Sequence, residues 1–262
     1  MALVTVAAKP LHVAHRSVGT GPPELVLVHG WAGSGVYFDE LLAALDLGHV
    51  RVTSLDLSGH GESAPREGDW SLDRIDGEIL SVLDAIGAER AVLLGFSMAG
   101  KFVQHFALQH PARVAGLILV AGTQASAIAL PAEILEDWYA RAGNADAMKE
   151  LVRAFLTRTV DEAALDRFCR DAARVPEAAL RGTMAASVER DFSSEVARLA
   201  VPMLVVAGAR DELFTPELLH ATIVSQIHGA RMAVIDCGHE IGLEAPRELA
   251  AVVEAFLAGL GS

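Results

Sequence analysis

Short apolar runs recur along the chain, and most are followed by turn residues and then by a longer stretch with helical periodicity. This alternation is typical of βα units and predicts a mostly parallel, doubly wound sheet, because continuous apolar strands must be covered on both faces. A looser alternation before them predicts an antiparallel edge hairpin. The predicted strands are Leu25–His29, Val50–Asp56, Ala91–Phe96, Val114–Val120, Met203–Gly208 and Met232–Asp236, with the edge hairpin around Leu11–Val18.

Helical periodicity fills the intervals between these strands. The final stretch has a proline at its first helical position and a glycine near its end, which are typical start and stop signals. The predicted helices are Val36–Leu45, Ser71–Ile86, Met98–His110, Pro216–Ile227 and Pro246–Leu257.

One interval, residues 123–200, contains helical patterns and no strand candidate. We therefore expect a core of residues 1–122 and 201–262 and a helical lid of residues 123–200, inserted after the sixth strand. Ligands bind at the carboxyl edge of open α/β sheets, so an insertion at this edge would cover the binding site.

Composition restricts the class of protein further. A chain of 262 residues with 52% hydrophobic residues can bury a large core as one α/β unit. The formal net charge of −13 excludes nucleic acid and anionic membrane surfaces as partners. Cys169 and Cys237 lack the spacing of a zinc site or a disulfide framework, and we expect no metal or cofactor. The sequence shows no signal peptide or membrane span, which predicts a cytoplasmic protein.

The segment G-F-S-M-A-G, residues 95–100, follows a predicted strand and precedes a predicted helix. It resembles the G-x-S-x-G motif in the context that the motif requires, although Ala99 stands where a second glycine is usual. Because a serine on such a turn is exposed above the sheet, Ser97 is the predicted nucleophile. The alternative is a serine that only caps the helix.

A serine hydroxyl needs a base to take its proton, and the base needs a carboxylate to orient it. His239 follows the last predicted strand by a short turn, whereas the other nine histidines occupy less suitable positions. Asp211 follows the strand before, which gives the order Ser, Asp, His. Glu212 and Asp236 are the competing carboxylates.

The oxyanion of a tetrahedral intermediate needs preorganised donors, usually two backbone N–H groups. The amide of Met98 supplies one at the start of a helix, where the positive end of the helix dipole helps. The Gly-rich loop H-G-W-A-G-S-G after the first buried strand can supply the second, and we assign it to the amide of Trp31. The indole of Trp31 either lines the pocket or packs as a plain core aromatic.

Five segments in chain order resemble the successive motifs of the α/β-hydrolase fold superfamily, and they span nearly the whole chain outside the lid. They are H-G-W-A-G-S-G, D-L-S-G-H-G-E-S, G-F-S-M-A-G, G-A-R-D-E-L-F-T-P and G-H-E-I-G-L-E-A-P. The resemblance implies an α/β-hydrolase fold, and it implies that the second segment is a structural loop in which His60 is hydrogen-bonded and not catalytic.

The resemblance also narrows the chemistry. Serine at position 97 disfavours haloalkane dehalogenases and epoxide hydrolases, which carry Asp there, and dienelactone hydrolases, which carry Cys. The H-G-W loop resembles that of serine carboxylesterases, including the methyl esterase of biotin synthesis, and that of the cofactor-free haloperoxidase or perhydrolase group. Lys101 departs from these groups, which usually have a smaller or apolar residue there.

Aromatic residues in the lid predict a mainly apolar pocket, with Trp31, Phe38, Trp138 and Tyr139 as candidate lining residues. The predicted function is a serine hydrolase that cleaves carboxylic esters of small, mainly apolar substrates through an acyl-enzyme. Alternatives with the same triad are a C–C bond hydrolase, a lactonase or a perhydrolase, and a different class is a ligand-binding receptor on a hydrolase scaffold. The sequence leaves the physiological substrate and the oligomeric state open.

Overall fold

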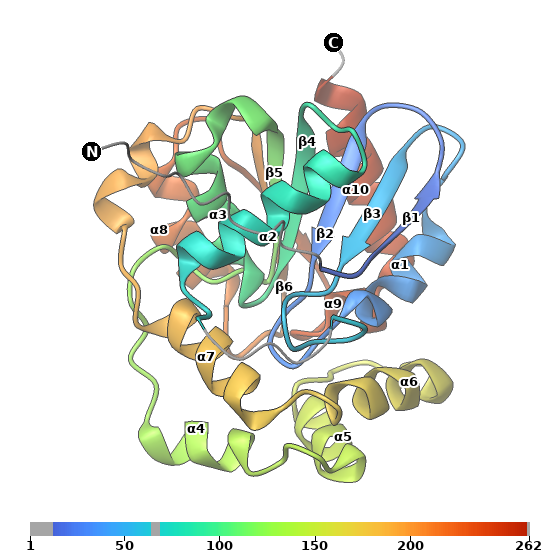
Figure 1. Cartoon of the computed structure of the whole chain (residues 1–262), viewed down its shortest axis with the longest axis vertical. Helices are drawn as coiled ribbons and strands as arrows, with labels where there is room; N and C mark the ends of the chain where they lie inside the picture. Colours follow the sequence, from blue (N-terminus) through green and yellow to red (C-terminus); the bar gives the residue numbers. More distant parts are fainter. Residues whose placement is uncertain (1–12, 64–68, 261–262) are drawn as a thin grey trace, which may run out of the picture.

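The computed structural model describes residues 13–63 and 69–260. Its described strands form one sheet in the order β1-β3-β2-β4-β5-β6-β7. All neighbouring pairs are parallel except β1 with β3, which is antiparallel at one edge (Figure 1). The strands are β1 (His15–Gly19), β2 (Glu24–Val28), β3 (Arg51–Leu55), β4 (Ala91–Phe96), β5 (Val114–Val120), β6 (Met203–Gly208) and β7 (Arg231–Ile235).

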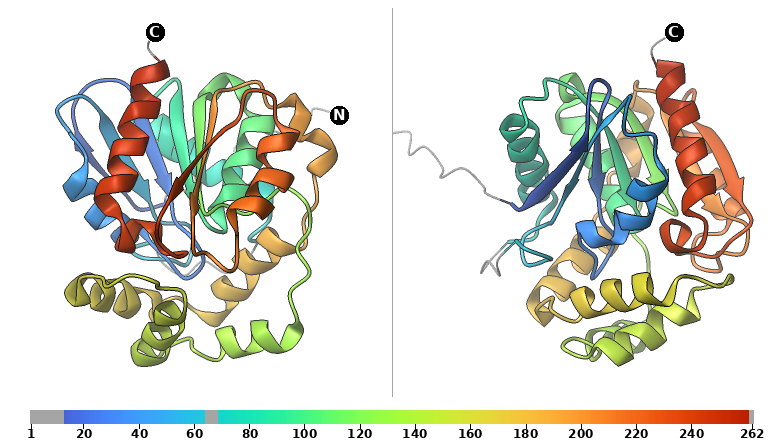
Figure 2. Two further views of the ribbon diagram at one scale, coloured as in Figure 1. Left: turned by 180° about the vertical axis from the view of Figure 1, so that it is seen from behind. Right: turned by 90° about the vertical axis from the view of Figure 1, so that its right-hand side faces the viewer.

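Helices cover both faces of the sheet. Figure 2 shows α1 (Asp39–Ala44) and α10 (Pro246–Leu260) on one face, with α2 (Leu72–Ala85) and α3 (Ala99–Gln109) on the other. Residues of α8 (Pro216–Thr222) belong to the same apolar cluster as α2 and α3. Alternate residues of β2 belong to the two opposite clusters, which explains why its sequence is apolar without interruption.

The predicted fold class is confirmed. The bounds of β4, β5 and β6 are those predicted, and each of the other three parallel strands differs from its predicted bounds by one residue at both ends. Two predicted helices are divided: the first is η1 (Gly35–Phe38) followed by α1, and the other is α8 followed by η4 (Val224–Gln226), because the backbone leaves the helical region at Ile223. Of the predicted edge hairpin, residues 11 and 12 lie outside the described residues.

Residues 123–200, which are all described, form helices and no strand. The α-helices of this interval lie together beyond the carboxyl ends of the strands (Figure 1). This helical insertion follows the fifth described strand, β5, and not a sixth as predicted, since the edge hairpin contributes only β1 to the described residues. Its elements are α4 (Ala132–Tyr139), α5 (Ala145–Ala154), α6 (Glu162–Ala172), α7 (Glu177–Val188) and η3 (Ser193–Arg198).

The two ends of the helical insertion meet at α3. The amide of Ile128 donates to the carbonyl of Val188 over 2.8 Å. The buried ammonium of Lys101 donates to the carbonyls of Ser126 (2.8 Å) and Arg190 (2.6 Å), one from each end. Burial lowers the pKa of Lys101 to about 8. These two acceptors explain how a lysine is accommodated where an apolar residue is usual, because a buried charge needs hydrogen-bond partners.

The first turn of α3 packs directly on the chain that leaves β5. A Cβ atom at Gly100 would lie 2.6 Å from the Cα of Gly122 and 2.8 Å from the amide nitrogen of Thr123. We expect Gly100→Ala to lower the free energy of unfolding by about 1–3 kcal/mol, because overpacking against backbone forces it to shift. Thermal unfolding measures the effect.

Gly259→Ala is the matched control, since it adds the same methyl group to α10 at a position where, apart from its chain neighbours and the backbone of its own helix, no atom of the described residues lies within 4 Å. That variant should be as stable as the wild type or more stable by up to about 1 kcal/mol. Equal melting temperatures for Gly100→Ala and the wild type would contradict the packing described here.

Candidate active site

The predicted nucleophile lies on a sharp turn between β4 and α3. Ser97 has a φ of 49°, in the left-handed region that non-glycine residues rarely adopt. A Cβ atom at Gly95 would lie 2.4 Å from the carbonyl oxygen of Ala99, so the turn needs glycine before the serine. Ala99 itself begins α3, where alanine is an excellent helix former. The turn therefore tolerates the missing second glycine.

Three strand ends bring the predicted triad together. Ser97 follows β4, Asp211 follows β6 and His239 follows β7. The Ser97 hydroxyl lies 2.9 Å from Nε2 of His239, and Nδ1 of His239 donates to Oδ2 of Asp211 over 2.8 Å. This arrangement leaves Nε2 free to accept a proton from the hydroxyl.

Of the three candidate carboxylates, Asp211 is the one that contacts His239. Its second carboxylate oxygen accepts the amides of Leu213 (2.8 Å) and Phe214 (3.0 Å), which orient the group toward His239. Glu212 is exposed, and Asp236 forms an ion pair with Arg210 at the surface. Only Asp211 among the three contacts the imidazole of His239.

The hydrogen-bonded pair of Asp211 and His239 has shifted pKa values that make His239 a stronger base. Burial alone would lower the pKa of His239, but the hydrogen bond and the charge of Asp211 raise it above its ordinary value, with further contributions from Glu240 and Glu244. Burial opposes ionisation of Asp211, yet its bond to His239 and the two backbone amides hold its pKa below the ordinary value. The carboxylate is thus ionised and stabilises a protonated imidazole.

The two predicted oxyanion donors lie beside this triad. Met98 precedes the first residue of α3, and Trp31 lies in the loop after β2, where Ala32 has a φ of 57°. Both residues line the cavity described below. In residues 13–63 and 69–260 no acceptor takes the amide N–H of either one, and their role as oxyanion donors stays a prediction.

A cavity of about 160 Å³ opens beside Ser97 between the core and the helical insertion. Trp31 and Trp138 line it, as the sequence predicts. Polar lining residues are few, and among the described residues no lysine or arginine lines it. The polar residues are Ser97, Thr123, Gln124, Ser187, His239 and Glu240, and the apolar ones include Phe96, Ile128, Leu130, Met148, Leu151, Val152, Phe155, Phe168, Met184, Leu213, Phe214 and Leu218.

Two predicted pocket residues do not reach the cavity. Phe38 is 1% exposed and packs edge-on against Tyr37, in the apolar cluster that includes Leu25 of β2. Tyr139 lies behind Trp31, with ring centres 6.2 Å apart, and the guanidinium of Arg181 covers it at 4.2 Å. The helix face that carries Trp138 is the one that faces the cavity.

Sequence reasoning missed Glu240 and Phe214, which also line the cavity. Burial raises the pKa of Glu240 to about 7. Phe214 places its ring 5.6 Å from that of His239. Both residues are within three positions of a triad member in the sequence, and this proximity could have indicated that they lie at the site.

His60 is a structural residue, as the resemblance implies. It is fully buried, its Nδ1 donates to the carbonyl of Ser58 over 3.1 Å, and its ring lies 4.9 Å from that of His29. Burial lowers the pKa of His60 to about 3, so the ring is neutral. Nε2 of His29 in turn accepts the amide of Leu57, which joins the two loops after β2 and β3.

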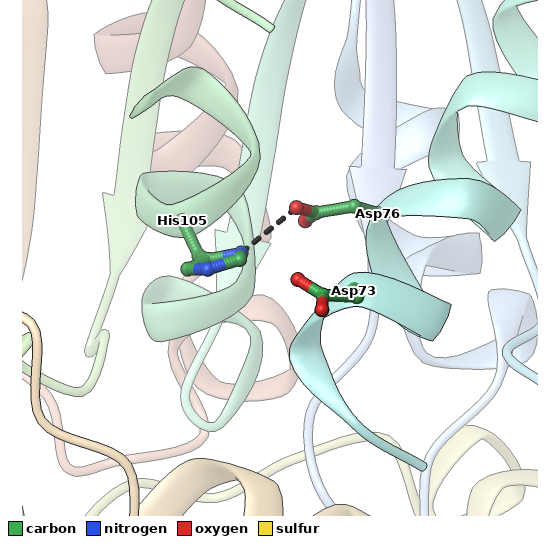
Figure 3. A group of neighbouring side chains, drawn as sticks. All are labelled: Asp73, Asp76 and His105. Atoms are coloured by element: carbon green, nitrogen blue, oxygen red, sulfur yellow. Dashed lines mark hydrogen bonds and ion pairs between the residues drawn. The ribbon is translucent and has the colours of Figure 1, made fainter. Parts of the chain in front are cut away.

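One group of side chains in the described residues has the composition of a metal site. Asp73 and Asp76 of α2 and His105 of α3 hold ligand atoms within 4.8 Å of one another (Figure 3). Nδ1 of His105 donates to Oδ2 of Asp76 over 2.8 Å. This hydrogen bond connects α2 to α3, which gives the two side chains a structural role. None of the three lines the cavity beside Ser97.

Among the described helices, none combines the length and apolar character needed to cross a bilayer.

Comparison with known proteins identifies the class to which this fold and site belong. The model of the alpha/beta hydrolase fold family matches residues 23–172. The chain therefore belongs to that family, and its resemblance to hydrolases of this fold is confirmed.

Relatives with different activities share similar identity with this chain. A 2-hydroxy-6-oxononadienedioate/2-hydroxy-6-oxononatrienedioate hydrolase of Paraburkholderia xenovorans is 29% identical over 93% of this chain and 90% of its own length. A pimeloyl-[acyl-carrier protein] methyl ester esterase of Xanthomonas axonopodis pv. citri is 28% identical over 93% of this chain and 98% of its own. The crystal structure of a hydrolase from Pseudomonas aeruginosa is 29% identical, with a TM-score of 0.78 over 94% of each chain. The chain is thus a hydrolase.

The hydrogen bond between Asp211 and His239 makes a prediction that does not depend on the substrate. An NMR titration of the imidazole should give His239 a pKa above the ordinary 6.5. Asp211→Asn removes the facing charge, so the pKa of His239 should fall and the ring should be neutral over a wider pH range.

Asp236→Asn is the control, because it removes the competing carboxylate that pairs with Arg210 instead. It should leave the pKa of His239 unchanged. A larger shift in Asp236→Asn than in Asp211→Asn would contradict the assignment of the orienting carboxylate.

Proposed function

We propose that the protein is a serine carboxylesterase that cleaves small, mainly apolar esters, with residues 123–200 acting as its lid. The observation that carries the proposal is the hydrogen-bonded chain from Ser97 through His239 to Asp211 beside an apolar cavity. A small-molecule ester is the only partner that the proposed reaction requires, and we retain the cytoplasmic location predicted by the sequence as part of the proposal.

The proposed reaction has two halves. Ser97 Oγ attacks the ester carbonyl while His239 takes its proton, and the amides of Trp31 and Met98 bind the oxyanion. The tetrahedral intermediate collapses, His239 gives the proton to the leaving alcohol, and an acyl-enzyme remains on Ser97. Water that is deprotonated by His239 then attacks the acyl group, and collapse of the second intermediate returns the proton to Ser97. Asp211 stabilises the imidazolium in both halves.

The charge of the cavity supports an ester over a dianionic C–C substrate. The Paraburkholderia relative is named for dioates, which carry two carboxylates, whereas among the described residues no lysine or arginine lines this cavity. A carboxylate placed in such a cavity loses hydration without gaining a cationic partner, which is costly. Similarity to that relative over 93% of the chain nevertheless makes C–C bond hydrolysis the second candidate, with the same nucleophile and base.

Labelling with a fluorophosphonate tests the nucleophile. The probe should modify the wild type at Ser97, and Ser97→Ala should lose the label and at least about 10³-fold in kcat for p-nitrophenyl butyrate, with its fold intact by circular dichroism. Ser187→Ala is the matched control, because Ser187 lines the same cavity and has no histidine partner in the described residues. That variant should still be labelled at Ser97. Retained labelling of Ser97→Ala would refute the assignment.

A pair of esters of similar length tests the substrate class. We expect kcat/KM for p-nitrophenyl butyrate to exceed that for p-nitrophenyl hemisuccinate by about a hundredfold or more, because the terminal carboxylate would be buried without a counter-charge. Assays of a vinylogous diketone and of its dicarboxylate analogue complete the panel. Faster cleavage of the dicarboxylate diketone than of any ester would favour the second candidate.

A further inference from the structure

A single buried carboxylate joins the helical insertion to the loop that carries His239. Glu244 ends the short helix α9 (Ile241–Glu244) and is 5% exposed. Its Oε2 atom accepts the amide of Thr157 (2.7 Å), the hydroxyl of Thr157 (3.0 Å), the amide of Arg158 (2.8 Å) and the amide of Gly238 (3.1 Å). Three of these donors belong to the insertion, and the fourth immediately precedes His239.

The same stretch of the insertion, residues 155–158, also bonds directly to the loops of the triad. The amide of His239 donates to the carbonyl of Phe155 over 3.3 Å. The guanidinium of Arg210, the residue before Asp211, donates to the carbonyl of Thr157 over 3.4 Å. The packing is close, since a Cβ atom at Gly238 would lie 2.4 Å from the carbonyl oxygen of Phe155. We call residues 155–158 the tether segment.

The tether segment is also part of the cavity wall. Phe155 lines the cavity, and its ring lies 6.0 Å from that of His239 and 5.9 Å from that of Trp138. A ligand that contacts the ring of Phe155 therefore contacts a segment whose backbone is hydrogen-bonded to the amide of His239. The cavity wall and the base are thus mechanically connected.

The negative charge of Glu244 strengthens the hydrogen bonds that its carboxylate accepts. Within the described residues no ion pair reaches this carboxylate, so N–H and O–H donors provide its direct stabilisation. Hydrogen bonds to an ionised acceptor are roughly twice as strong as those between neutral groups. A neutral amide at this position would hold the same donors more weakly.

We propose that Glu244 is a positioning residue that fixes the tether segment to the histidine loop, so that the lid wall and His239 keep one common geometry. The inference rests on the proposed function, because it concerns the placement of the general base. An error of about 1 Å in the placement of a catalytic group can cost about 10²-fold in rate. A purely structural role would instead lower stability and leave the chemistry of the folded enzyme unchanged.

Glu244→Gln is the test variant, because it keeps the shape of the side chain and removes its charge. With p-nitrophenyl butyrate we expect kcat to fall about tenfold, with a smaller change in KM. Amide hydrogen exchange in the tether segment should become about tenfold faster, because local opening becomes easier.

The pH profile provides a readout that a purely structural residue would not move. The titratable groups that act on His239 are Asp211, Glu240 and Glu244, and all three raise its pKa against the effect of burial. Removing the charge of Glu244 should therefore lower the pKa of His239. Because the base must be neutral, the acid limb of kcat/KM should move to lower pH.

Glu248→Gln is the matched control. Glu248 bonds to the tether segment through the side chain of Arg158, at 3.0 Å, but it lies at the surface and does not contact the histidine loop. Its variant should keep the wild-type kcat, pH profile and exchange rates. Wild-type kcat and an unmoved acid limb in Glu244→Gln would overturn the proposal, even if that variant melts at a lower temperature.

Thr157→Val decides the question if Glu244→Gln fails to fold. It removes only the hydroxyl that donates to Oε2, and it should lower kcat about threefold and accelerate exchange at residues 157–158, as expected for loss of one charge-assisted bond in a partly redundant set. Unchanged kcat and exchange would overturn the proposal. Absence of fluorophosphonate labelling in the wild type would refute the proposed esterase instead, whereas the exchange measurements test the tether without it.

Discussion

The left-handed backbone at Ser97 is the constraint on which the candidate site depends. A non-glycine residue in this conformation costs about 1–3 kcal/mol and persists only where its surroundings enforce it. Here the amide of Ser97 donates to the carbonyl of Val120, and its own carbonyl accepts the amides of Gly100 and Thr123. These bonds fix the turn to the end of β5 and to the first turn of α3, which keeps Ser97 beside the cavity that Met98 also lines.

The parallel sheet supplies the rest of the site, and this part could be predicted from the sequence. Apolar runs followed by turns locate the strand ends, and parallel strands place those ends at one edge. Asp211 and His239 follow two such runs, so their meeting with Ser97 depends on topology that the pattern of hydrophobic residues already encodes. The choice of Asp211 over Asp236 also follows from strand ends, because Asp236 remains beside its strand and pairs with Arg210.

Side-chain direction and long-range contacts could not be predicted in this way. Trp138 and Tyr139 are adjacent on one helix, and only the packing of that helix decides that the first faces the cavity and the second faces Arg181. Phe38 has a plausible position in sequence, but the turn that carries it points inward. The donors that Glu244 receives from the tether segment are more than 80 residues away along the chain, and no local pattern indicates them.

The attachment of the helical insertion to Lys101 has a consequence for how such an enzyme diversifies. Because the chain enters and leaves the insertion at two carbonyls bound by one ammonium, its ends are held close together whatever lies between them. Helices of the insertion outside the tether segment could therefore be lengthened without displacing the chain where it leaves β5 and returns toward β6. The junction thus sets the two points at which the insertion joins the core, and the length of chain between these points can vary without changing the distance between them.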